Sequence, residues 1–177
     1  MPKVRKRSTV PLTVSRPALL VDGSDAELRA LIYDLVAYGH RLHACRGAFA
    51  AIAGLSPVQY EILMIAGRSR GLAVGEVAAR LHRSGAFITV EASKLAERGI
   101  LTKSPDPADG RRVLLTVTAA GMDLIRRLAP FQVRVNDELF GRLDARRFRE
   151  LRALARDLVS AGNRAVALLG VLMQEAA

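Results

Sequence analysis

The sequence predicts a mainly α-helical protein with one small β-hairpin near the middle of the chain. Apolar residues recur at helical spacing through most of the 177 residues. Two capping patterns, each a serine followed three residues later by glutamate or glutamine, precede long helical stretches. Two short strand-like runs, residues 101–104 and 113–117, enclose a cluster of turn-forming residues. The length fits one domain, or one domain with arms.

The composition is strongly basic. Lys and Arg number 27 against 17 Asp and Glu, so the formal net charge is +10, and such a chain attracts polyanions, nucleic acid above all. The single cysteine excludes an intramolecular disulfide and a four-cysteine zinc site. The longest apolar stretch of the last helix, residues 165–173, is far below the about 18 residues of a membrane span. The N-terminus also lacks a signal peptide, so we expect a cytoplasmic protein with no membrane partner.

Residues 1–23 form a basic N-terminal arm, which the sequence predicts to be extended. Three prolines interrupt any helix, and the five basic residues are Lys3, Arg5, Lys6, Arg7 and Arg16. Three interpretations remain open: an arm that touches phosphate or the minor groove, a disordered end with incidental charge, or a segment lying on a partner subunit. The pattern Ser24-x-x-Glu27 then predicts a capping box that opens a long helix ending near Ala53.

Three further helices are predicted between residues 56 and 98. A second capping box, Ser56-Pro57-x-Gln59, opens a helix that ends near Arg68. Val74–Leu81 reads as a short amphipathic helix, and Ser84 is a good N-cap for the next helix, residues 84–98. Two short helices joined by a tight turn, the second with a small, uncharged leading face, suit insertion into the major groove of DNA.

A hairpin follows at once, and its tip is basic. Residues 105–110 are dense in turn formers and are expected to exclude regular structure. Arg111 and Arg112 stand where the loop enters the second strand, where a guanidinium can reach a narrow minor groove or phosphates. Asp109 is expected to brace Arg111 through an ion pair. The alternative is an ordinary solvated hairpin.

The rest of the chain is predicted to be helical. One helix begins after Thr118 and reaches about Phe140, with a kink at Pro130. Asp144 caps the last helix, whose apolar stripe needs a surface against which to pack. The stripe comprises Phe148, Leu151, Leu154, Ala155 and Leu158.

Several motifs resemble the MarR family of dimeric transcriptional regulators over residues 25–165. They are Leu55-Ser56-Pro57-x-Gln59-Tyr60, Val74-x-Glu76-Val77-Ala78, Leu95-x-Glu97-Arg98-Gly99-Ile100 and Asp106-Pro107-x-Asp109-Gly110-Arg111-Arg112, followed by Val117-Thr118-x-x-Gly121. The resemblance implies a winged helix-turn-helix DNA-binding domain at 55–118 and a helical dimerisation region at 24–54 and 119–177. It further implies a homodimer that represses from a palindromic site in double-stranded DNA and is released by a small aromatic or phenolic effector. Phe87 and Val90 depart from the polar and basic residues that family members often have there.

The candidate DNA-binding residues lie on the second helix of the pair, at the turn before it, and on the hairpin. They are Arg83, Ser84, Ala86, Phe87, Thr89, Val90, Lys94, Lys103, Asp109, Arg111 and Arg112. By location alone, the resemblance makes His43, Arg46 and Tyr60 candidates for an effector pocket. Arg46 could equally pair with a glutamate across the core.

Other functions find less support in the residues. A protein-interaction module could use Phe87 and Val90 as its contact, and a low-specificity DNA-binding protein could rely on charge alone. No nucleophile is accompanied by a base and an orienting acid, so we expect no enzyme and no cofactor. His40 and His43 have no acid or cysteine nearby, so a metal site is not expected. Cys45 reads as a small core residue rather than a redox switch.

Overall fold

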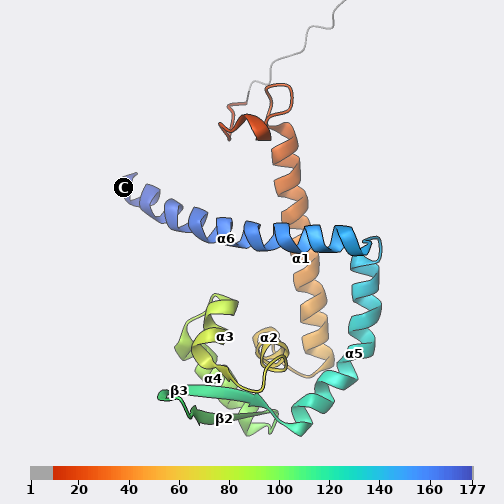
Figure 1. Ribbon diagram of the computed structural model, residues 1–177, viewed down its shortest axis with the longest axis vertical. Coiled ribbons are helices and arrows are strands. Elements are labelled where there is room, and N and C mark those ends of the chain that lie inside the picture. The colour runs from red at the N-terminus through yellow and green to blue at the C-terminus, as the bar shows by residue number, and fades with distance from the viewer. Residues whose placement is uncertain (1–9, 177) are drawn as a thin grey trace, which may run out of the picture. The chain divides into compact units, whose positions relative to one another are not determined.

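The computed structural model describes residues 10–176 and confirms a mainly α-helical fold with a small antiparallel sheet (Figure 1). The elements in order are a 3-10 turn at Pro17–Leu19, α1 Ala26–Ile52, α2 Pro57–Ala66, β1 Leu72–Ala73, α3 Val74–Leu81, α4 Gly85–Glu97, β2 Leu101–Asp106, β3 Asp109–Val117, α5 Ala119–Phe140 and α6 Ala145–Glu175. The described chain divides into two compact units, the first ending at Ala129 and the second beginning at Pro130.

The segment before α1 folds back on the start of that helix instead of extending. Asp25 is the N-cap, but its side chain caps no helical N–H. Its Oδ2 accepts hydrogen bonds from the backbone N–H of Thr13 at 2.7 Å and from the Thr13 hydroxyl at 2.6 Å, while Arg29 lies 2.5 Å from Oδ1. These contacts hold the pKa of Asp25 below its usual value, with the Thr13 hydroxyl as the largest cause. The predicted extended arm is therefore wrong for the part that the structure describes, and Lys3, Arg5, Lys6 and Arg7 lie outside that part.

The predicted capping box at Ser24 is also wrong. Ser24 Oγ accepts a hydrogen bond from Ala26 N–H at 3.3 Å, and the helix begins one residue later than that pattern requires. The second capping box is confirmed. Gln59 N–H donates to Ser56 Oγ at 3.3 Å, and Ser56 N–H donates back to Gln59 Oε1 at 3.2 Å. Two of the orphan N–H groups at the start of α2 are thereby satisfied.

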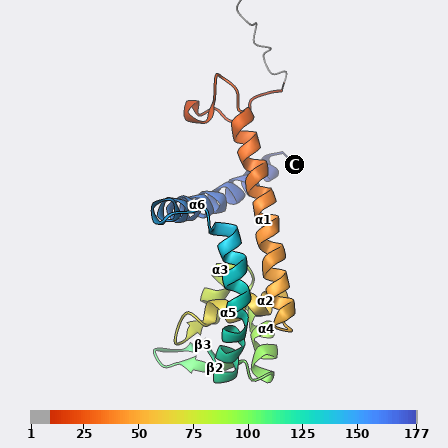
Figure 2. The ribbon, with the colours of Figure 1, turned by 90° about the vertical axis from the view of Figure 1, so that its right-hand side faces the viewer.

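The core of the first unit lies where α2, α3 and α4 meet the sheet. Contacts join α2 to α1, α3 and α4, and α3 to α4. The largest fully buried apolar side chains come from each of these layers and from α5. They are Ile62, Leu63, Val77, Ile88, Leu95, Leu101, Leu115 and Leu128. In both ribbon views the β2–β3 hairpin lies at the end of this unit opposite the start of α1 (Figure 2).

The sheet has three strands in the order β1-β3-β2, all antiparallel. The two-residue strand β1 was not predicted. The expectation that residues 105–110 exclude regular structure is wrong, because Pro105 pairs with Val113 and Asp106 with Asp109, next to a shift in register. Proline is tolerated in an edge strand, whose outer N–H positions face away from the sheet, and β2 is such a strand. The turn is therefore reduced to Pro107 and Ala108.

The second unit contains the last part of α5 and the 31-residue helix α6. Pro130 lies inside α5 and does not end it. Asp144 caps α6 as predicted, accepting a hydrogen bond from Arg147 N–H at 2.7 Å. No residue of α6 is buried, and its apolar stripe is exposed in the single chain.

Within residues 10–176 no single helix is both long enough and apolar enough to cross a membrane. Helices α1 and α2 reach that length and composition only when taken together, and they are bent by 88° at the break between them.

Candidate nucleic-acid interface

The helix-turn-helix is formed by α3 and α4. His82 takes a left-handed conformation with φ of 51° and ends α3. Ser84 then caps α4, since Phe87 N–H donates to Ser84 Oγ at 3.2 Å. Gly99 follows α4 in a left-handed conformation with φ of 68°, which is typical of the residue after a helix.

Helix α4 separates buried and exposed residues sharply. Ile88, Ala92 and Leu95 are fully buried. The outward face, which we define as Ala86, Phe87, Thr89, Val90 and Ser93, is exposed except for the half-buried Ser93. Sequence periodicity alone placed four of these five side chains among the candidate residues.

The wing, strands β2 and β3, holds its two arginines differently. Arg112 Nη2 lies 2.8 Å from Glu76 Oε1 of α3, and its Nε lies 3.7 Å from Asp106 Oδ2. Arg111 is exposed, and its guanidinium has no hydrogen-bond or ion-pair partner within residues 10–176. The expected ion pair between Asp109 and Arg111 does not form. Asp109 Oδ1 instead accepts a hydrogen bond from the backbone N–H of Arg111 at 3.1 Å, which fixes the turn.

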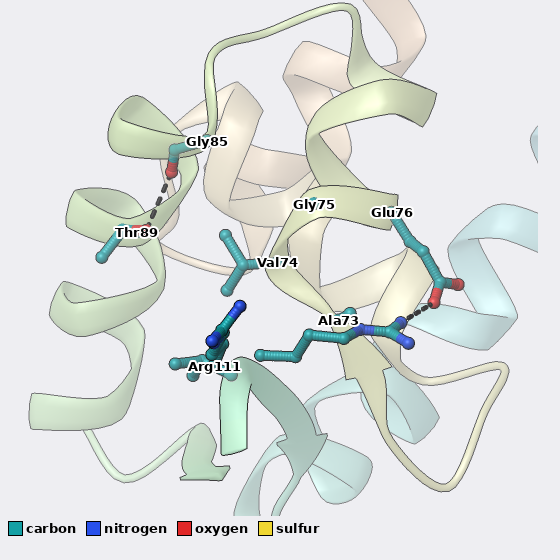
Figure 3. Close-up of a pocket in the computed structure, with 9 residues that line it drawn as sticks. Ala73, Val74, Gly75, Glu76, Gly85, Thr89 and Arg111 are labelled. Atoms are coloured by element: carbon teal, nitrogen blue, oxygen red, sulfur yellow. Dashed lines mark hydrogen bonds and ion pairs between the residues drawn. The ribbon is translucent and has the colours of Figure 1, made fainter. Parts of the chain in front are cut away.

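An open groove of about 480 Å³ lies between α3, α4 and the wing. Arg111 rises beneath Val74, with Thr89 on one side and Glu76 on the other (Figure 3). The residues that line the groove are Ala73, Val74, Gly75, Glu76, Gly85, Thr89, Arg111, Arg112 and Val113. The structure thus brings Arg111 of the wing close to the start of α4, which lies more than 20 positions earlier in the sequence.

Comparison with known proteins points to the same family as the sequence motifs. Residues 53–112 match the model of the MarR family. A putative transcriptional regulatory protein for the hcr operon of Thauera aromatica is 24% identical over 135 residues, which cover 70% of this chain and 81% of that protein. The helix-turn-helix and most of the wing are thus similar to the MarR family, and a relative that covers most of the chain is described as a transcriptional regulator.

Two solved structures have the same fold as this chain. The MarR-family regulator Sco3205 from Streptomyces coelicolor, solved in complex with DNA, matches with a TM-score of 0.67 and 21% identity, over 77% of this chain and 88% of that one. CouR from Rhodococcus jostii RHA1, solved bound to p-coumaroyl-CoA, matches with a TM-score of 0.68 and 20% identity, over 76% of this chain and 95% of that one.

A buried carboxylate links α2 to α4, and it was not predicted from the sequence. Glu91 is only 7% exposed, yet its Oε2 accepts a hydrogen bond from Gln59 Nε2 at 2.9 Å and its Oε1 lies 2.5 Å from Lys94 Nζ. The bond from Lys94 is the largest reason that the pKa of Glu91 is lowered, and burial opposes the shift. Lys94, a candidate DNA contact, is therefore already paired within the protein. A glutamate three residues before a lysine was the available signal.

Lys103 also has a partner within the protein. Its ammonium donates to Ser93 Oγ at 2.9 Å and so joins β2 to α4. The remaining DNA candidates, Arg83 and Ser84, are exposed at the turn before α4.

The three effector candidates have ordinary surroundings. Arg46 Nε lies 3.2 Å from Glu61 Oε1, and its guanidinium stands 5.7 Å from the centre of the Tyr60 ring. Tyr60 is buried against Phe49, with ring centroids 6.1 Å apart. His43 is exposed. Within residues 10–176, no three His, Cys, Asp or Glu side chains gather closely enough to hold a metal ion.

Proposed function

We propose that the protein is a homodimeric repressor that binds a palindromic operator, with α4 in the major groove and the wing beside it. The observation that supports this most directly is the joint exposure of the outward face of α4 and the unpaired Arg111 next to one groove. A helix of this kind reads base edges, while a guanidinium on a hairpin reaches the minor groove or phosphates. The solved complex of Sco3205 with DNA is consistent with this proposal.

Dimerisation would use the helices outside residues 55–118. Leu31, Ile32, Leu35 and Val36 of α1 are each about half exposed, and α6 leaves its whole apolar stripe uncovered. Exposed apolar surface on this scale marks an interface. A two-fold axis through it would place two α4 helices on a palindrome. Residues 24–54 and 119–177 are thus the proposed dimerisation region, and residues 55–118 the DNA-binding domain.

A small aromatic effector would release the operator by favouring a dimer in which the two α4 helices are wrongly spaced. CouR, of the same fold, was solved with p-coumaroyl-CoA. The α1–α2 contact at Arg46, Glu61 and Tyr60 is the region where such a ligand would act, since it joins the proposed dimer helices to the DNA-binding domain. A promoter-binding protein works at the chromosome, so we place it in the cytoplasm.

The test is footprinting of the purified protein on fragments of its genome at physiological salt. A protected palindrome with half-sites about one helical turn apart supports the proposal. Even protection of all fragments that disappears as salt rises would indicate a charge-driven, low-specificity binder instead. No DNA binding at any salt would favour a protein-interaction module.

A further inference from the structure

Helix α4 has few side-chain donors, and each is engaged within the protein. The donors in residues 85–97 are Thr89, Ser93 and Lys94. The Thr89 hydroxyl donates to Gly85 O at 2.8 Å, and the Ser93 hydroxyl donates to Thr89 O at 2.9 Å. Lys94 is held by Glu91 at 2.5 Å. Moving Lys94 to a phosphate would leave a buried carboxylate with only the Gln59 amide as donor, which is costly.

The same helix instead presents apolar side chains to the outside. Val90 is 53% exposed and Phe87 is 43% exposed. Ala86 lies one helical turn before Val90, and Phe87 lies three residues before it, so the three side chains form one continuous surface. They stand away from the core residues Ile88 and Leu95, which are fully buried in the same helix. Packing of the described chain therefore gives no reason for apolar residues at these positions.

We propose that Ala86, Phe87 and Val90 recognise thymine methyl groups, so that thymines facing α4 define the operator half-site. This inference rests on the proposed operator binding. The thymine 5-methyl is the apolar group that unmodified DNA presents in the major groove, and apolar side chains are its natural partners. Val90 and Phe87 would be specificity-determining residues, and hydrogen bonds to bases from Thr89, Ser93 and Lys94 would contribute little.

The surroundings of this surface favour DNA over an apolar protein partner. Arg83 is exposed at the turn before α4, and the unpaired Arg111 stands at the groove on its other side. The chain as a whole carries a formal charge of +10. A small apolar strip beside exposed cations complements a methyl-lined groove between two rows of phosphates.

The experiment replaces each thymine of the footprinted half-site by deoxyuridine, which removes only the methyl and leaves the base-pairing pattern intact. We expect affinity to fall about fourfold at each thymine that contacts the strip, from the transfer free energy of one buried methyl group. Replacing the same thymine by 5-methylcytosine should cost less than replacing it by cytosine, because the methyl is retained.

Two variants assign the contact. In Val90→Ala and Phe87→Ala, the deoxyuridine penalty at the thymine facing the altered side chain should disappear. Thr89→Val is the control: valine and threonine are nearly equal in size, so this variant should keep every penalty. Val90→Ala also favours the helix, so loss of folding is not expected.

Specific operator binding without any deoxyuridine penalty overturns this inference and leaves the proposed function intact. Deoxyuridine penalties that persist in both Val90→Ala and Phe87→Ala would mean that other side chains contact the methyl groups, and would also overturn this inference. Absence of any protected site overturns both proposals, and binding to a protein through Phe87 would replace them.

Discussion

Two adjacent wing arginines have the same charge and different surroundings. Arg112 is held by Glu76 and Asp106, so its guanidinium braces the wing against α3. Such half-exposed ion pairs contribute about 0.2–1 kcal/mol each. Arg111 has no such partner among residues 10–176, and its side chain lies in the groove (Figure 3). The residue that touches DNA is therefore expected to be Arg111, with Arg112 positioning the strand that carries it.

Arg111→Ala should weaken operator binding by roughly 1–3 kcal/mol, the usual loss for an arginine that makes a specific contact. The midpoint of thermal unfolding should not change, because no intramolecular partner is lost. Fluorescence anisotropy with labelled operator measures the affinity. Arg127→Ala removes the same charge from the exposed surface of α5 and is the matched control; an equal loss in the Arg111 and Arg127 variants would mean that only net charge matters.

Glu91 should make stability depend on pH. Its pKa is lowered in the folded protein from the ordinary 4.5, chiefly by Lys94. The stabilisation is therefore complete above the unfolded pKa and is lost as pH falls through the lower, folded pKa. Glu91→Gln should lower the free energy of unfolding at pH 7 by about 1 kcal/mol, a modest value because Lys94 is half exposed.

The same variant should lose less stability than the unaltered protein when the pH is lowered from about 6 to about 3.5. Urea denaturation at both pH values measures this difference. Glu97→Gln changes an exposed glutamate of the same helix and should behave as the unaltered protein does. Identical acid sensitivity in Glu91→Gln would contradict the role given to the pair.

At the scale of single residues, the sequence predicted which side chains are exposed better than it predicted which residues they contact. The outward face of α4 could be predicted, because the helical spacing of the apolar residues in 85–97 defines the buried face and therefore the opposite one. The partner of Arg112 could not be foreseen, because Glu76 lies 36 positions away and becomes its neighbour only when the wing folds against α3. The prediction that Asp109 pairs with the Arg111 side chain was wrong. A short acidic side chain two residues before an arginine reaches the backbone N–H more easily than the guanidinium.

Elements whose boundaries depend on local signals were predicted well. Val74–Leu81, the Ser84 cap, the Ser56–Gln59 capping box and the Asp144 cap are all confirmed. Errors arose where tertiary contacts decide the outcome. Thr13 withdraws Asp25 from capping α1, β1 exists only because it pairs with β3, and the edge position of β2 allows Pro105 within a strand.

The junction between the sheet and α5 depends on a glycine. A Cβ at Gly121 would overlap the carbonyl oxygen of Ile100 and lie 2.7 Å from Val117 Cγ1. Gly121→Ala should therefore reduce the free energy of unfolding by about 1–3 kcal/mol, the usual cost of overpacking. Gly47→Ala in α1 meets nothing within 4 Å and should be neutral or stabilising by about 0.4–1 kcal/mol. Chemical denaturation of both variants tests the contrast, and equal stabilities would show that the start of α5 can shift.

At the scale of the whole molecule, the single chain leaves a large apolar surface exposed to water. Helix α6 contributes no buried residue, and an amphipathic helix of 31 residues is rarely stable without a surface to cover its apolar face. The first half of α1 has the same character. A second copy of the chain would cover both, and operator binding would then require the dimer.

Leu154→Glu tests this requirement at the centre of the stripe. Leu154 is 59% exposed in the single chain, and glutamate has a helix propensity close to that of leucine, so α6 itself should persist. If the stripe forms the dimer interface, the variant loses an apolar contact and buries a charge, and the dimer dissociation constant should rise by at least about tenfold. Sedimentation equilibrium measures this constant, and operator affinity should fall with it. Ser160→Glu adds the same charge on the opposite face of α6 and should leave the dimer intact. A Leu154→Glu protein that remains dimeric at the same concentrations would locate the interface elsewhere.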